Sequence, residues 1–226
     1  MNVDIVKSIA ALPGTAVLVA LLIAAGLLVV LTNWRLLIFA LGAQYILIGL
    51  MLTRVVPIEL AAVKTLVGVM ICPVLYITAR RVHWGQVEED SEADEEAVRP
   101  KRRWWWIIGA GLPVRVIVTA LALAMSISLA SRNPLPITAD QTLSRDFTIG
   151  AFSVMLLGLI NAALAENPLK VGLGLLSFLA GFELFFTAVE PTLTIVGLLG
   201  LTNLILALAI SYLTTAWASR RSEVKA

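Results

Sequence analysis

Seven long apolar stretches, separated by polar breaks, constrain this chain more than any other feature of its sequence. A helix of roughly 20 apolar residues crosses the hydrocarbon core of a bilayer. The stretches are Pro13–Thr32, Arg35–Thr53, Ile58–Ala79, Trp105–Ala130, Phe147–Ala165, Leu169–Val189 and Thr192–Trp217. Because backbone groups in lipid must be hydrogen-bonded internally, each stretch is predicted to be a helix. We expect an all-α, polytopic membrane helix bundle of about seven transmembrane helices; the alternative is six, without the first.

Composition agrees with this class and excludes several kinds of site. Hydrophobic residues make up 59% of the chain and charged residues only 14%, whereas about a quarter of a soluble domain is charged. The single cysteine, Cys72, excludes an internal disulfide and a cysteine-based metal site. The single histidine, His83, leaves no imidazole pair. There is no nucleophile-elbow or phosphate-loop pattern. We therefore expect no catalytic residues, metal site, cofactor or nucleic-acid partner, and no self-contained enzyme.

The apolar stretches and the loops between them divide the chain into five parts. Residues 1–79 form a first bundle of three spans, 105–130 a connector span and 131–217 a second bundle of three spans. The start of the first bundle is expected to be a retained helix rather than a signal peptide, because its apolar run is too long. Residues 80–104 form an acidic linker, which is either a solvated spacer or a docking strip for a basic partner. Residues 218–226 form a tail, and the second loop, 131–146, is expected to be a turn-rich connection.

The basic residues are distributed unequally between the two sides of the predicted bundle. With the acidic linker in the cytoplasm, that side gathers Arg35, Arg80, Arg81, Arg99, Lys101, Arg102, Arg103, Lys170, Arg220, Arg221 and Lys225. The other side has only Lys7, Arg54, Arg132 and Arg145. Cytoplasmic loops carry the excess of basic residues. We therefore expect a multi-pass protein of the cell inner membrane, with its N-terminus outside and its linker and C-terminus cytoplasmic.

A shift of 134 residues relates the two halves of the chain. It carries Asn33 onto Asn167 and Pro57 onto Pro191, across the second and sixth spans. Spans one to three then match spans five to seven in the same orientation, with span four as the connector. Such parallel repeats are a known membrane architecture, so the sequence indicates a possible parallel 3+1+3 repeat.

Few ionisable residues fall inside the spans, and each is a candidate for a proton or ion path. A charge at the centre of a membrane helix costs roughly 2.5–3.5 kcal/mol on insertion scales. Lys64 and Glu183 lie at similar depth near the outer side, so they either pair across the bundle or reach the interface separately. Asn203 lies near the middle of its span. Arg115 lies near the midplane if span four begins at Trp105, or at the cytoplasmic face if it begins at Pro113.

Neutral polar residues are expected on interior faces, mostly as hydrogen-bonding contacts between helices. They are Gln44, Thr65, Ser153, Asn161, Ser177, Thr202 and Asn203. Pro73 lies inside the third span, where it removes a helical hydrogen bond and favours a kink.

Two stretches resemble small membrane subunits of complex I and its relatives. Residues 33–82 include NWRLLIFALGAQYILIGL and ICPVLYITARR, and residues 166–217 begin ENPLKVGLGLLSF. They are similar to membrane component E of the hydrogenase-four and formate-hydrogenlyase type, an enlarged relative of NADH-quinone oxidoreductase subunit K. The family's membrane glutamate would fall at Leu176, but the acid here is Glu183; its second acid would fall near Asn203. Its lysine lies about five residues before the proline, whereas Lys64 precedes Pro73 by nine.

The resemblance implies an accessory membrane subunit of a complex I-like NADH-quinone oxidoreductase or a membrane-bound hydrogenase. Such a subunit lies in the lipid bilayer beside antiporter-like membrane subunits. It supports proton or ion translocation through Lys64, Glu183 and Asn203, or seals the interface, and the shifted charges favour the structural role. Two alternatives are a stand-alone small transporter and a membrane scaffold protein that recruits a soluble partner through its acidic linker.

Overall fold

The computed structural model describes residues 14–82, 84, 112–132, 141–165, 167–190 and 192–225, and in this part of the chain the regular elements are all α-helices. The helices are α2 (Gly14–Val30), α3 (Trp34–Leu52), α4 (Ile58–Arg81), α6 (Leu112–Arg132), α7 (Gln141–Leu164), α8 (Pro168–Val189) and α9 (Leu193–Lys225). The expected all-α, multi-span bundle is confirmed. Six of these helices are long and apolar enough to cross a membrane, and α2 is shorter at 17 residues.

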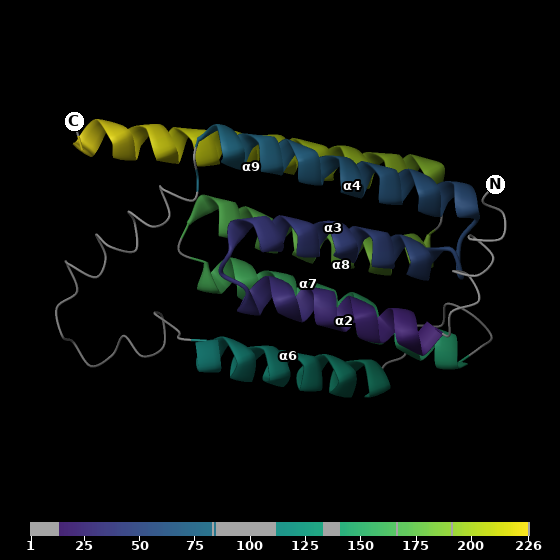
Figure 1. Cartoon of the computed structure of the whole chain (residues 1–226). Helices are drawn as coiled ribbons and strands as arrows, with labels where there is room; N and C mark the ends of the chain where they lie inside the picture. The colour runs from purple at the N-terminus through teal and green to yellow at the C-terminus, as the bar shows by residue number, and fades with distance from the viewer. Residues whose placement is uncertain are drawn as a thin grey trace, which may run out of the picture.

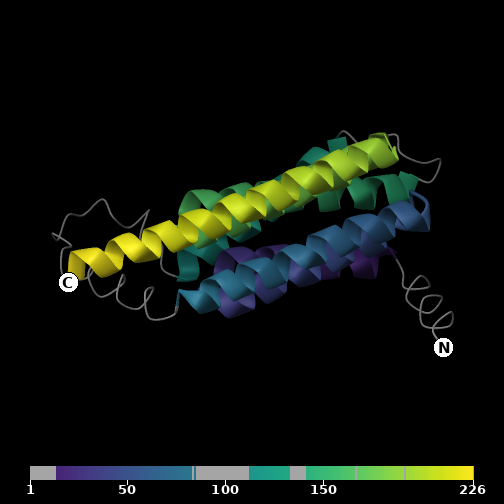
Figure 2. The same ribbon diagram turned by 90° about the horizontal axis from the view of Figure 1, so that it is seen from above.

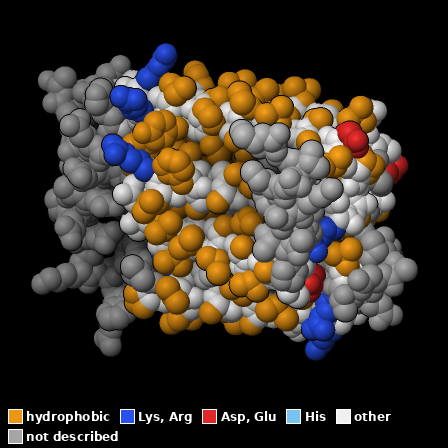
Figure 3. Space-filling view, turned by 45° about the vertical axis from the view of Figure 1, so that its right-hand side comes forward, with side chains coloured by type: hydrophobic (Ala, Val, Ile, Leu, Met, Phe, Trp, Pro, Cys, Tyr) orange, Lys and Arg blue, Asp and Glu red, His pale blue; other side chains and the backbone are white. Residues whose placement is uncertain are grey.

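The surface of the bundle has the distribution expected of a protein that lies in lipid. Large apolar side chains point outward along its whole middle, such as Phe39 at 69%, Ile117 at 65% and Leu66 at 64% exposure. In Figure 3 hydrophobic side chains cover the middle of the visible face, while Lys, Arg, Asp and Glu side chains gather towards its two ends. An apolar belt between two charged ends is stable only where lipid replaces water around it.

The helices form two layers of three, with α6 along one edge (Figures 1 and 2). One layer contains α2, α3 and α4, and the other contains α7, α8 and α9. Between the layers α2 packs on α7, α3 on α8 and α4 on α9, while α6 packs on α2 and α7. The C-terminal ends of α4 and α9 lie at the same end of the bundle, which is the arrangement required if the linker and the C-terminal tail share one side of the membrane.

The layers correspond helix by helix under the shift of 134 residues found in the sequence. It carries the end of α2, Val30, onto the end of α7, Leu164, and the start of α3, Trp34, onto the start of α8, Pro168. The helix-capping residues match too. The Asn33 side chain accepts a hydrogen bond from the Arg35 N–H, and that of Asn167 accepts one from the Lys170 N–H. Each asparagine satisfies a backbone donor that has no partner within its helix. The two halves therefore share one three-helix plan.

Two helix boundaries differ from the boundaries expected from hydropathy. The connection assigned to residues 131–146 is shorter, because α7 begins at Gln141 rather than at Phe147. Polar residues continue a helix beyond the lipid at little cost, so the apolar run marks where the membrane starts and not where the helix does. For the same reason α9 continues through residues 218–225. Most of the acidic linker, and the start of the connector span predicted at Trp105, lie outside the described residues.

The closest packing in the bundle is between α7 and α8, where glycines allow the two backbones to touch. A Cβ atom added at Gly158 or Gly174 would overlap backbone atoms of the opposite helix, and one at Gly181 would lie 2.6 Å from the Met155 nitrogen. Small residues are the usual means of close helix approach in membranes. This contact fixes α8, which carries the candidate site.

We predict that Gly158→Ala and Gly174→Ala each lower the free energy of unfolding by about 1–3 kcal/mol, because the added methyl group forces the two backbones apart. The measurement is thermal unfolding in detergent, followed with a thiol-reactive dye that reports exposure of Cys72, the single cysteine of the chain. Gly197→Ala is the matched control, since a Cβ atom there has no atom within 4 Å. Equal midpoints for all three variants would show that the α7–α8 contact does not need glycine.

Candidate functional site

Lys64 and Glu183 meet inside the bundle as an ion pair. Lys64 is the seventh residue of α4 and Glu183 is six residues before the end of α8, so each lies about 9 Å along its helix from the same end of the bundle. The Lys64 Nζ and Glu183 Oε2 atoms are 2.5 Å apart, and the two side chains are only 7% and 2% exposed. Of the two arrangements considered from the sequence, the structure shows the pair.

Asn203 completes the cluster from a third helix, α9. Its Nδ2 atom donates a hydrogen bond to Glu183 Oε2 at 2.9 Å, and its side chain is 2% exposed. One carboxylate oxygen therefore receives both the ammonium and the amide. The other, Glu183 Oε1, and the amide oxygen of Asn203 are buried without a hydrogen-bond partner among the described residues. Such atoms are costly to bury unless something satisfies them.

A lateral groove between α4 and α9 reaches this cluster. Its volume is about 240 Å³, and Lys64, Glu183 and Asn203 line it together with Val63, Val67, Val196, Gly197, Gly200, Leu201 and Leu204. The apolar members belong to the walls and rim, where Val63 is 41% and Leu201 53% exposed. The ion pair thus lies at the polar floor of a groove whose sides are apolar.

Arg115, the fourth candidate, lies elsewhere. It is in the first turn of the described part of α6, and its Nη1 atom is 3.5 Å from the carbonyl oxygen of Val29, the penultimate residue of α2. Helices α2 and α4 run in the same direction, so this is the end of the bundle away from Lys64. The placement fits a span that begins at Pro113, with the guanidinium reaching the end of the bundle.

A second polar contact joins the two layers. Gln44 on α3 and Ser177 on α8 exchange hydrogen bonds: the Gln44 amide donates to the Ser177 hydroxyl at 2.9 Å, and that hydroxyl donates back at 3.2 Å. Both residues are buried. Each had been placed on an interior face from the sequence, but their partnership had not, because hydropathy does not say which helices are neighbours. Thr202 was wrongly placed inside, since its side chain is exposed.

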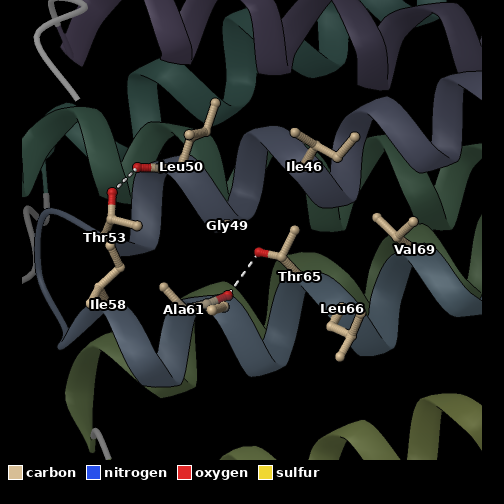
Figure 4. Close-up of a pocket in the computed structure, with 10 residues that line it drawn as sticks. Ile46, Gly49, Leu50, Thr53, Ile58, Ala61, Thr65, Leu66 and Val69 are labelled. Carbon is tan, nitrogen blue, oxygen red and sulfur yellow. Dashed lines mark hydrogen bonds between the residues drawn. The ribbon is translucent and has the colours of Figure 1, made fainter. Parts of the chain in front are cut away.

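The bundle also has a larger groove, between α3 and α4, that offers no comparable chemistry. It has a volume of about 410 Å³ and is lined almost entirely by apolar side chains. The Thr65 hydroxyl in this groove donates to the carbonyl oxygen of Ala61, and the Thr53 hydroxyl donates to that of Leu50 (Figure 4). Both hydroxyls are satisfied within their own helices, so the described residues that line this groove offer no free polar group to a ligand. The larger groove is therefore the weaker candidate for a functional site.

Comparisons with known proteins give no relative from which a role for the site could be inferred. No protein-family profile matches the chain, and no curated protein or solved structure shows significant similarity to it. Within the described residues, no group of three or more His, Cys, Asp or Glu side chains is placed to hold a metal ion. What the arrangement offers chemically is a buried carboxylate held between an ammonium and an amide.

We predict that Lys64→Leu and Glu183→Leu each destabilise the protein by about 3–5 kcal/mol, because each leaves its partner's charge buried and unpaired. The double variant should be more stable than either single variant, since it removes both charges together. Unfolding midpoints of the four proteins in detergent give the coupling energy. Glu59→Leu, which changes an exposed acid in the first turn of α4, is the control and should combine additively with Lys64→Leu. Additive losses for the buried pair would contradict the ion pair.

Proposed function

We propose that this chain is an accessory membrane subunit of a complex I-like NADH-quinone oxidoreductase or a membrane-bound hydrogenase, where it supports proton or ion translocation. The single observation that carries the proposal is the buried cluster of Lys64, Glu183 and Asn203. Ionisable residues within membrane spans are rare and mark ion or proton paths by default. Lys64 and Glu183 both carry ionisable groups. Asn203 orients the Glu183 carboxylate through its hydrogen bond to Oε2.

Buried polar residues recur along α8 on both sides of Glu183. Along the helix axis, Thr187 lies one turn towards the end, a rise of about 6 Å, and Ser177 with its partner Gln44 lies a rise of about 9 Å in the other direction. Lys170, near the start of α8, is also buried. This series supports a polar route along the helix. Bridging water is required along it, because these intervals are longer than a hydrogen bond.

The bundle favours an accessory role over that of a stand-alone transporter. Transporter sites are typically formed by helices that are broken near the bilayer midplane, whereas α4 continues through Pro73 and the central part of α9 is continuous. The proposed accessory role leaves redox chemistry to partner subunits. Antiporter-like membrane subunits, packed laterally, are the partners that the proposal requires, in a cell inner membrane with the C-terminus cytoplasmic.

We predict that Lys64→Met and Glu183→Gln reduce the ion movement of the host's complex to a small fraction of the wild-type value, because each removes one of the two titrating groups. Ion movement per electron transferred is measured in membrane vesicles, alongside the amount of antiporter-like subunit that co-purifies. Ion movement is normalised to the amount of subunit that co-purifies, so that loss of assembly is not read as loss of translocation. Glu59→Gln, at an exposed acid, should keep both properties. Wild-type ion movement in both buried-site variants, or purification of the native chain as a stable isolated monomer, would contradict the proposal.

A further inference from the structure

The groove between α4 and α9 ends on two buried acceptor atoms, Glu183 Oε1 and Asn203 Oδ1, that no described residue satisfies. We propose that it receives one side chain from a transmembrane helix of a partner subunit, and that this side chain donates a hydrogen bond to the cluster of Glu183 and Asn203. The proposal rests on the proposed function, because an accessory subunit has such neighbours. Its evidence is the chemistry of the floor, the size of the groove and the shape of its walls.

The floor selects a hydrogen-bond donor. The two atoms without a partner among the described residues, Glu183 Oε1 and Asn203 Oδ1, are both acceptors. Lys64 and Asn203 both donate to the other carboxylate oxygen, Oε2. The last torsion of a glutamate side chain is soft, so a small rotation turns Oε1 towards an arriving donor. An approaching carboxylate would meet only repulsion from Glu183.

The charge of the cluster favours a neutral donor over a cation. Lys64 and Glu183 already balance one another within apolar surroundings. A second cation would leave the site with one uncompensated charge, which is costly in a membrane interior. A glutamine, tryptophan or tyrosine side chain supplies an N–H or O–H group without that cost.

The size of the groove favours a single side chain over a lipid-soluble ligand. Its volume of about 240 Å³ is below the roughly 300–1,000 Å³ of typical small-molecule pockets. The α9 side of the groove also has little side-chain bulk, because two of its residues are glycines. A Cβ atom at Gly197 would have no atom within 4 Å, and one at Gly200 would lie 3.4 Å from Val67, so a neighbouring helix can approach the α9 backbone closely. The exposed side chains of Val63, Leu201 and Leu204 then form an apolar rim around the polar contact.

A photo-cross-linking amino acid in place of Leu201 tests the occupant in membranes of the host. Leu201 lines the groove, whereas Leu198, on the same helix and similarly exposed at 62%, does not. We expect the probe at Leu201 to join one protein, at a peptide that lies in an apolar helix and contains a neutral donor residue. The probe at Leu198 should give lipid adducts. Identical adducts from both positions, or only lipid or a small molecule at Leu201, would overturn the proposal.

Filling the groove gives a second measurement. Gly197→Trp should lower the amount of that partner recovered with the chain by roughly tenfold, which is about 1.4 kcal/mol of binding free energy. Leu198→Trp places the same side chain one residue away and should leave recovery unchanged. The comparison is valid only if both variants have the wild-type unfolding midpoint in the thiol-dye assay. Unchanged recovery with folded Gly197→Trp would count against docking in the groove.

The two proposals fail in distinguishable ways. If Leu201 finds only lipid while Lys64→Met still abolishes ion movement, the docking proposal is wrong and the proposed function stands. If Leu201 joins a partner helix while both buried-site variants keep wild-type ion movement, docking stands and the role in translocation is wrong.

Discussion

The ion pair between Lys64 and Glu183 is the interaction that aligns the two layers of this bundle. Lipid is as apolar as the helices themselves, so helices associate through close packing, as in the α7–α8 contact, and through polar contacts that specify which helices meet. Two charges that must meet do give a preference, because each is costly to bury alone. The pair joins α4 in one layer to α8 in the other, and Asn203 adds α9. Three helices are thereby held in one register at one depth.

The two halves share a scaffold but do not share the site. Under the shift of 134 residues, Lys64 corresponds to Leu198, Glu183 to Gly49 and Asn203 to Val69. Leu198 faces outward, and Gly49 lies against the Thr65 side chain. The capping asparagines and the turn prolines, by contrast, occur in both halves. The residues at these turns thus occur in both halves, whereas the charged cluster has no counterpart under the shift and needs both halves to form.

Sequence predicted the depth of residues along the membrane normal better than it predicted their neighbours. The apolar runs and the capping asparagines give the spans, and equal distance from the helix ends placed Lys64 beside Glu183 in depth. The direction in which a side chain points around its helix axis cannot be read from hydropathy, because both the lipid face and the core face of these helices are apolar. For that reason the partnership of Gln44 with Ser177, the exposure of Thr202 and the α4–α9 groove emerged only from the fold.

A closed ion pair stabilises the bundle but also holds its own charges in place, so a role in ion transfer requires something that loosens it. The arrangement around Glu183 indicates what that is. Both donors that the described residues supply act on a single oxygen, Oε2, and a third donor at Oε1 would draw the carboxylate away from Lys64. A partner side chain in the groove would therefore compete with the ammonium for the same carboxylate. Docking and proton transfer would then be linked through one residue, Glu183, without any movement of the helices that carry it.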